Sequence, residues 1–216
     1  MHSDFSPAFP KAVLFDLLTA LLDSWTVWNA AAGSEQAGRA WRAEYLRLTY
    51  GCGAYVPYEE LVRSAARNTG LPLQAVDRLE ANWETLPVWS GVDEVLRELA
   101  GKTKLAVVTN CSKRLGNIAA QRLEVQWNCV ITAEEAGFYK PDPRPYQMTL
   151  DRLGVSAAEA AFVAGSAYDL FGTSKVGLRT YWHNRIGLQK PAGAPDADLE
   201  SPTLEKLIPW LRGDAS

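Results

Sequence analysis

An uninterrupted run of apolar residues stands near the start of the chain, from Ala12 to Phe15, and ends at an acid, Asp16. Such a run is typical of a strand that is buried on both faces of a parallel sheet. Open parallel sheets bind their ligands at the carboxyl ends of their strands. Asp16 therefore has two interpretations: it caps the turn after the strand, or it belongs to a ligand-binding site.

The residues that follow, up to about position 86, place their apolar side chains at helical spacing and show no strand pattern. Gly33, Gly53 and Gly70 divide this stretch into segments of helical length. We expect the tryptophans of these helices to form their common core. The helices are predicted over residues 24–32, 35–50, 58–68 and 72–83, and the tryptophans are Trp25, Trp28, Trp41 and Trp83.

From Pro87 onward, short apolar runs alternate with amphipathic segments. This alternation predicts an α/β fold, a doubly wound parallel sheet with right-handed crossovers. The helical stretch is then an insertion over the carboxyl edge of the sheet, where a lid is useful. The predicted strands are 105–108, 128–131, 161–164 and 179–183; the predicted helices are 91–99, 113–123, 144–153, 169–176 and 203–211; residues 134–137 are predicted as a turn and 184–201 as a loop. The core is assigned to residues 1–22 and 87–216, and the helical cap to residues 23–86.

Charge and composition exclude several classes of protein. The chain has 22 Lys and Arg against 25 Asp and Glu, without the basic surplus of a nucleic-acid or membrane-surface binder. No apolar run approaches the roughly 20 residues of a membrane span, and residues 1–10 lack the pattern of a signal peptide. The three cysteines, Cys52, Cys111 and Cys129, are widely spaced, which predicts a reducing, cytoplasmic setting without a structural zinc site.

Polar residues follow four of the predicted strands. They include two acids, one lysine and two neutral hydrogen-bonding residues, which together are a specific set, although any one of them alone is weak evidence. A doubly wound sheet brings the ends of its strands to one crevice, so we expect these side chains to lie together. They are Asp16, Thr109 with Asn110, Lys140, and the segment from Ser166 to Asp169.

Over nearly its whole length the chain resembles the haloacid dehalogenase superfamily. The four segments that carry the resemblance are Phe15–Asp23, Val107–Asn110, Lys140–Tyr146 and Phe162–Asp169, in the order and spacing of the family's motifs. The resemblance implies a Rossmann-like core with a helical cap between the first two motifs. In the cap, the segment from Trp41 to Leu46 resembles that of (S)-2-haloacid dehalogenases whose arginine holds the halide.

The leaving group of the reaction distinguishes a phosphatase from a dehalogenase. A phosphatase of this superfamily usually carries a second aspartate two residues after the nucleophile, where it protonates a departing alkoxide. Leu18 stands there, and Gly165 stands where a metal-binding aspartate is usual. A halide leaves without a proton, so displacement at an α-carbon through an aspartyl ester needs neither group. We therefore expect a 2-haloacid dehalogenase that forms a 2-hydroxy acid and needs no cofactor.

The resemblance implies a role for each candidate residue. Asp16 would be the nucleophile, Lys140 would orient it and lower its pKa, and Asp169 would direct the hydrolytic water. Arg42 and Asn110 would hold the halide, although a helical arginine is often a surface salt-bridge partner. Further substrate contacts are expected at Thr109, Leu17, Leu18, Tyr146 and Ser166. A homodimer is common in the family.

The chain departs from the family at supporting positions. Thr19 and Ala20 follow the nucleophile where Gly and Thr are usual, and Ala164 and Ser166 stand where Ser and Asn are usual. The altered hydroxyls at Ala20 and Ala164 keep open the alternative of a weakly active or inactive member that binds an anion. A second alternative, a Mg²⁺-dependent phosphatase of small metabolites, rests on the resemblance to the superfamily and on the pair of acids Asp16 and Asp169.

Overall fold

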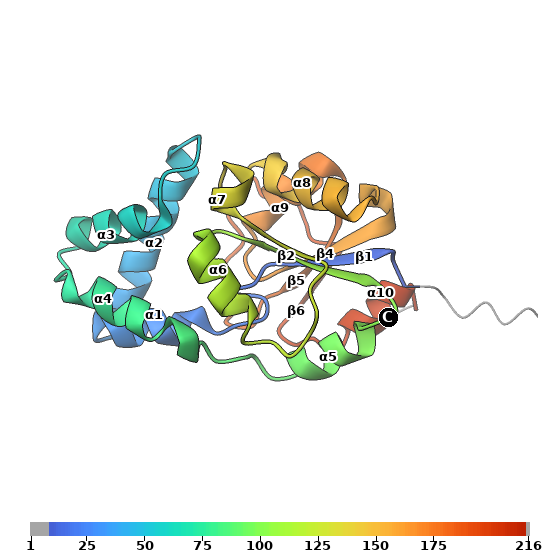
Figure 1. Ribbon diagram of the computed structural model, residues 1–216, viewed down its shortest axis with the longest axis horizontal. Coiled ribbons are helices and arrows are strands. Elements are labelled where there is room, and N and C mark those ends of the chain that lie inside the picture. The colour runs from blue at the N-terminus through green and yellow to red at the C-terminus, as the bar shows by residue number, and fades with distance from the viewer. Residues whose placement is uncertain (1–8, 215–216) are drawn as a thin grey trace, which may run out of the picture.

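A six-stranded parallel sheet forms the centre of the protein in the computed structural model, which describes residues 9–214 (Figure 1). The strand order is β3-β2-β1-β4-β5-β6, and every neighbouring pair is parallel. The prediction of an α/β, Rossmann-like doubly wound sheet is confirmed. The signal-peptide prediction concerns residues 1–10, of which 1–8 lie outside the described part. The strands are β1 (Ala12–Phe15), β2 (Lys104–Thr109), β3 (Cys129–Thr132), β4 (Ala160–Ala164), β5 (Arg179–His183) and β6 (Leu199–Ser201).

Strand β1 lies between β2 and β4, and its four residues are fully buried. Val13 and Phe15 face one hydrophobic layer, while Ala12 and Leu14 face the other. This placement explains the uninterrupted apolar run, because both faces of the strand are covered by helices. One layer contains α5 (Val92–Leu99), α6 (Lys113–Ala120) and α10 (Leu207–Arg212); the other contains α8 (Pro143–Leu153) and α9 (Asp169–Val176).

Four helices, which we call the cap helices, stand beside the sheet (Figure 1). Asp23 and Ser34 accept backbone hydrogen bonds at the starts of the first two, as capping residues do. Leu22 and Val88 form an antiparallel bridge where the chain leaves the core and returns to it. This bridge supports the proposed boundaries of the cap at residues 23 and 86. The cap helices are α1 (Ser24–Ala32), α2 (Glu35–Gly51), α3 (Tyr58–Asn68) and α4 (Gln74–Ala81).

Aromatic side chains hold the cap helices together. The rings of Trp28 and Trp41 lie 4.6 Å apart, and those of Tyr45 and Tyr58 lie 5.3 Å apart. Trp41 is fully buried, and its Nε1 donates to the Val62 carbonyl at 2.9 Å. The buried indole nitrogen is thus satisfied, which makes Trp41 a stabilising core residue.

The cap is tied to the core by hydrogen bonds to main-chain carbonyls. Trp83 Nε1 donates to Leu115 on α6 at 2.9 Å, and Tyr45 Oη donates to Asn110 after β2 at 3.0 Å. Trp41 and Trp83 therefore lie in the core as expected. No helix within residues 9–214 is both long and apolar enough to cross a bilayer.

Helices α4 and α6 end at Ala81 and Ala120, two and three residues before the predicted ends, and three further elements differ more strongly from prediction. Strand β6 lies in the expected loop, because a three-residue edge strand with alternating polarity is too short to give a pattern. Residues 133–136 form a short helix, α7 (Ala133–Ala136), which Thr132 caps and Gly137 ends with a φ of 75°. Helix α10 begins only at Leu207; the Thr203 carbonyl accepts a bond from Tyr181 Oη instead.

We expect Trp41→Ala to lower the free energy of unfolding by about 3–5 kcal/mol, because it removes a fully buried indole and leaves a cavity. The matched control is Leu73→Ala, since Leu73 is 40% exposed and its loss should cost about 0.5 kcal/mol or less. Denaturant unfolding followed by tryptophan fluorescence and circular dichroism measures both. Equal losses in the two variants would contradict the assignment of Trp41 to the core.

Candidate active site

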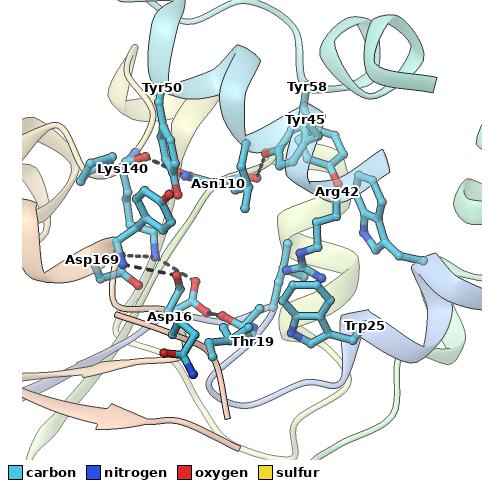
Figure 2. A pocket seen from close by; sticks show the side chains of 18 residues that line it. Asp16, Thr19, Trp25, Arg42, Tyr45, Tyr50, Tyr58, Asn110, Lys140 and Asp169 are labelled. Atoms are coloured by element: carbon cyan, nitrogen blue, oxygen red, sulfur yellow. Dashed lines mark hydrogen bonds and ion pairs between the residues drawn. The ribbon is translucent and has the colours of Figure 1, made fainter. Parts of the chain in front are cut away.

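A cavity of about 160 Å³ lies between the cap helices and the carboxyl edge of the sheet. Figure 2 shows Asp16, Lys140 and Asp169 gathered on one side of it, with Arg42 and Trp25 across from them. The first group comes from the core and the second from cap helices α1 and α2. The cavity is therefore closed only when cap and core are together.

The two carboxylate oxygens of Asp16 have different surroundings. Oδ1 accepts a bond from Lys140 Nζ at 2.8 Å. Oδ2 accepts three bonds: from Thr19 N at 2.9 Å, Thr19 Oγ1 at 2.5 Å and Ala20 N at 3.1 Å. Burial by itself would raise the pKa of Asp16, but the Lys140 charge and these donors outweigh it and lower the pKa. Asp16 is thus ionised at neutral pH.

Lys140 is buried between two carboxylates. Its Nζ lies 2.8 Å from Asp16 Oδ1 and 3.0 Å from Asp169 Oδ1. Burial opposes its charge, but the two carboxylates dominate and raise the pKa of Lys140. The ammonium group therefore remains protonated while it links the ends of two separate chain segments.

Asn110 holds the main chain of Lys140 on both sides. Its Nδ2 donates to the Lys140 carbonyl at 2.9 Å, and its Oδ1 accepts from Lys140 N at 2.7 Å. The side chain also lines the cavity. Since an amide nitrogen has two hydrogens, one remains for a ligand. Asn110 thus positions Lys140 as well as facing the cavity.

Asp169 begins helix α9 and is buried. Its Oδ1 accepts bonds from Tyr146 Oη at 2.6 Å and from Lys140. Burial, together with the like charge of Asp16, raises the pKa of Asp169 despite the opposing charge of Lys140. A carboxylate with a raised pKa is a better proton acceptor, which suits a general base.

Arg42 on α2 is only 8% exposed, so its interpretation as a surface salt-bridge partner is wrong. Its Nη1 donates to Ser24 Oγ at 2.8 Å, and its guanidinium lies 4.0 Å from the Trp25 ring centroid. Within residues 9–214 it forms no salt bridge. Burial lowers the pKa of Arg42, and a buried cation is costly without a counter-charge. The cavity therefore offers a place for an anion.

Three predicted contact residues do not line the cavity. Leu17 is fully buried and packs in the hydrophobic core. Thr109 ends β2 and is buried, with its Oγ1 3.7 Å from Cys111 Sγ. Tyr146 is also buried, and its hydroxyl donates to Asp169 and supports that carboxylate from behind. Leu18 and Ser166 do line the cavity. The substrate contacts expected of the side chains of Leu17, Thr109 and Tyr146 are thus wrong.

Several aromatic residues line the cavity without having been predicted there. Trp25 and Trp28 were expected in the cap core, yet both contact the cavity. Tyr50 of α2 stacks on Tyr168 at 4.6 Å, which joins the cap to the start of α9. Thr19 had a local signal, because a hydroxyl three residues after an acid can reach back to it. Further lining residues are Tyr45, Tyr58, Leu188 and Gln189.

The site does not fit the magnesium of a superfamily phosphatase. A Cβ atom at Gly165 would lie 2.2 Å from Thr19 Oγ1 and 2.3 Å from Ala20 N, so no acidic side chain has room there. Lys140 already bridges Asp16 and Asp169. The described residues contain no group of three His, Cys, Asp or Glu side chains placed to hold a metal. Two carboxylates already paired with an ammonium group are a poor donor set for this cation.

A family model and several known proteins are similar to this chain over most of its length. A family model described as haloacid dehalogenase-like hydrolase matches residues 13–183. The (S)-2-haloacid dehalogenase 4A of Burkholderia cepacia is 30% identical over 194 residues, covering 82% of this chain and 84% of that protein. A phosphoglycolate phosphatase of Xanthomonas campestris is 28% identical over 195 residues, covering 85% and 88%.

Among solved structures, the L-2-haloacid dehalogenase of Xanthobacter autotrophicus with chloropropionic acid covalently bound superposes with a TM-score of 0.84. It is 21% identical and covers 95% of this chain and all of that one. At this identity the likeness establishes a common fold.

We expect Lys140→Met to lower the free energy of unfolding by about 3–5 kcal/mol near neutral pH, because two buried carboxylates lose their shared cation. Lys102→Met is the control, since its pair with Glu98 is exposed and contributes about 1 kcal/mol or less. Denaturant unfolding measures both.

The cost of Lys140→Met should shrink as the pH falls. In the parent protein, the lowered pKa of Asp16 means that its stabilising effect is lost as the pH falls through that value. In the variant, the buried carboxylates of Asp16 and Asp169 lack a cation, so we expect their pKa values to be raised. Protonation as the pH falls then removes the cost of the buried charge. A difference that stays constant between about pH 7 and about pH 4 would contradict the ion-pair explanation.

Proposed function

The chain belongs to the haloacid dehalogenase-like hydrolases, and from that premise we propose that it cleaves the carbon–halide bond of a small 2-haloalkanoic acid and releases a 2-hydroxy acid. The observation that carries the proposal is Arg42, a buried cation without a carboxylate partner in the described chain, across the cavity from the ionised Asp16 (Figure 2). A leaving halide needs such a cation opposite the attacking carboxylate.

In the first step the Asp16 carboxylate attacks the α-carbon of the substrate. The carbon–halide bond breaks as the new carbon–oxygen bond forms, and the halide leaves with both electrons toward Arg42 and the free Asn110 amide hydrogen. An aspartyl ester results. No proton is needed by the leaving group, so the apolar Leu18 beside Asp16 does not hinder this step.

In the second step water adds to Cγ of the ester. Asp169 accepts the proton of the water, and its raised pKa suits it to that task. Tyr146 and Lys140 hold the carboxylate in place through Oδ1. Cleavage of the ester releases the 2-hydroxy acid and regenerates Asp16.

The charge of the site favours a monoanionic substrate over a phosphate ester. Asp16 and Asp169 are balanced by Lys140 and Arg42, so the site has no surplus positive charge for a phosphate dianion. Transfer of a phosphoryl group relies on cations to offset that charge. Leu18 also offers no proton to a departing alkoxide. These features favour the dehalogenase over the phosphatase.

We expect the protein to release halide from L-2-chloropropionate or bromoacetate at a rate that EDTA does not change. Asp16→Asn should reduce turnover by roughly 10³-fold or more, because the amide is not a nucleophile. Halide electrode measurements follow the reaction. A wild-type rate no higher than that of Asp16→Asn would refute the proposal, and Mg²⁺-dependent phosphate release from small esters would support the phosphatase instead.

Replacement of Arg42 tests the halide-binding role separately. Arg42→Met should lower kcat/KM by about 10²-fold, because the charge opposite Asp16 is lost. The control is Arg47→Met on the same helix, whose exposed side chain pairs with Glu44 and should leave kcat/KM unchanged. Equal effects of the two substitutions would remove Arg42 from the binding site.

A further inference from the structure

We propose that Asp16 attacks through Oδ1 and that the turn after it, with the Thr19 hydroxyl, is the oxyanion hole for hydrolysis of the ester. This inference rests on the proposed function, and it assigns Thr19 a catalytic contact with a reacting atom. In this chain the hydroxyl comes from Thr19, and the next position is Ala20.

The two carboxylate oxygens of Asp16 differ in the number of donors that they receive. Oδ2 receives three donors, from Thr19 N, Thr19 Oγ1 and Ala20 N, and these occupy its lone pairs. Oδ1 receives one donor, Lys140 Nζ at 2.8 Å, and keeps a lone pair. The oxygen with the available lone pair is the better nucleophile, so the new bond forms on Oδ1.

Asp16 Oδ2 is the oxygen on which negative charge develops during hydrolysis of the ester. After alkylation of Oδ1, Oδ2 is the carbonyl oxygen of the ester. Addition of water to Cγ places negative charge on Oδ2, where the three donors already point at distances of 2.5–3.1 Å. Donors preorganised around the developing oxyanion, in a buried site, are the geometry that stabilises such an intermediate.

Gly165 makes this turn geometry feasible. A Cβ atom on Gly165 would lie 2.2 Å from Thr19 Oγ1 and 2.3 Å from Ala20 N, so any other residue would displace two of the donors. The Thr19 hydroxyl therefore occupies space that Gly165 leaves empty. Because Gly165 has no side chain, it cannot bind a metal, and for the same reason it leaves room for the Thr19 hydroxyl.

The outer side of the turn is held by two ring nitrogens. Trp89 Nε1 donates to the Thr19 carbonyl at 3.1 Å, and His183 Nδ1 lies 2.8 Å from the Ala20 carbonyl. Burial lowers the pKa of His183, so the neutral ring donates through Nδ1–H. Bonds to the carbonyls fix the peptide planes and hence the direction of the amide donors.

Hydrolysis of the ester consumes one water molecule. The water oxygen bonds to Cγ, one of its protons passes to Asp169, and the carbonyl electrons move onto Oδ2. As the carbonyl reforms, the bond from Cγ to Oδ1 breaks, and Oδ1 leaves as the hydroxyl oxygen of the product with the proton from Asp169. The water oxygen remains in Asp16, and its second proton is released to solvent as the Asp16 carboxylate is regenerated.

Thr19→Val tests the assignment, because it removes the hydroxyl and keeps the shape. It should slow ester hydrolysis by about 10²–10³-fold while alkylation stays within about threefold of the wild-type rate. Rapid mixing with bromoacetate should then show a burst of one halide per enzyme before a slow steady state. Intact-mass measurement after acid quench should show the alkylated chain. Thr19→Ser keeps the hydroxyl, so it should show neither the burst nor the accumulated alkylated chain.

The matched control is Thr103→Val, which removes a hydroxyl that donates to the Pro10 carbonyl, away from the cavity. It should show no burst and no alkylated chain. Circular dichroism and a thermal melt establish that each variant is folded. In Thr19→Val, slower alkylation without a burst or an accumulated ester would overturn the oxyanion hole while leaving the dehalogenase proposal intact. Absence of halide release by the wild-type protein would instead refute the proposed function, and this inference with it.

Discussion

The ammonium group of Lys140 is the interaction on which the site depends. It is buried between Asp16 and Asp169, which follow β1 and begin α9, and it links chain segments that only the folded sheet brings together. Desolvation of three charges is expensive, and such a network is stable only where each member is fully bonded. Thr19 and Tyr146 donate further bonds to the two carboxylates, and Asn110 holds the main chain of Lys140. The residues around the cavity therefore also support its charge pattern.

The cap is connected to the same network. Tyr45 donates to the carbonyl of Asn110, whose side chain holds Lys140, and Tyr50 stacks on Tyr168 just before Asp169. Cap packing and active-site geometry are therefore mechanically coupled. Aromatic rings from the cap line the cavity, and apolar walls of this kind strengthen the electrostatic interactions beside them.

Local patterns predicted the parts of this site that depend on local sequence. The apolar run before Asp16 identified a central strand, and the acids and lysine after strands identified the crevice. The positions of Trp25 and Arg42 in the cavity depend on how the cap helices pack over the core. No short segment of sequence contains that information. Thr109 was misplaced for a related reason: a strand-end position indicates the right edge of the sheet but not the direction of its side chain. Strand β6 pairs only because β5 provides a partner, and its three residues carry no pattern of their own.

The residues that depart from the family pattern cannot be interpreted one position at a time. Taken alone, Ala20 lacks a supporting hydroxyl and Gly165 lacks an acid, so each position suggests that a functional group of the family is missing. In three dimensions they belong to one arrangement: Thr19 supplies the hydroxyl, Ala20 supplies an amide donor, and Gly165 supplies the space for both. Asp16 Oδ2 thereby has three donors. The absence of a hydroxyl at Ala20, one of the two changes that raised the alternative of an inactive anion-binding protein, is thus offset by Thr19, which preserves the polarity around the carboxylate.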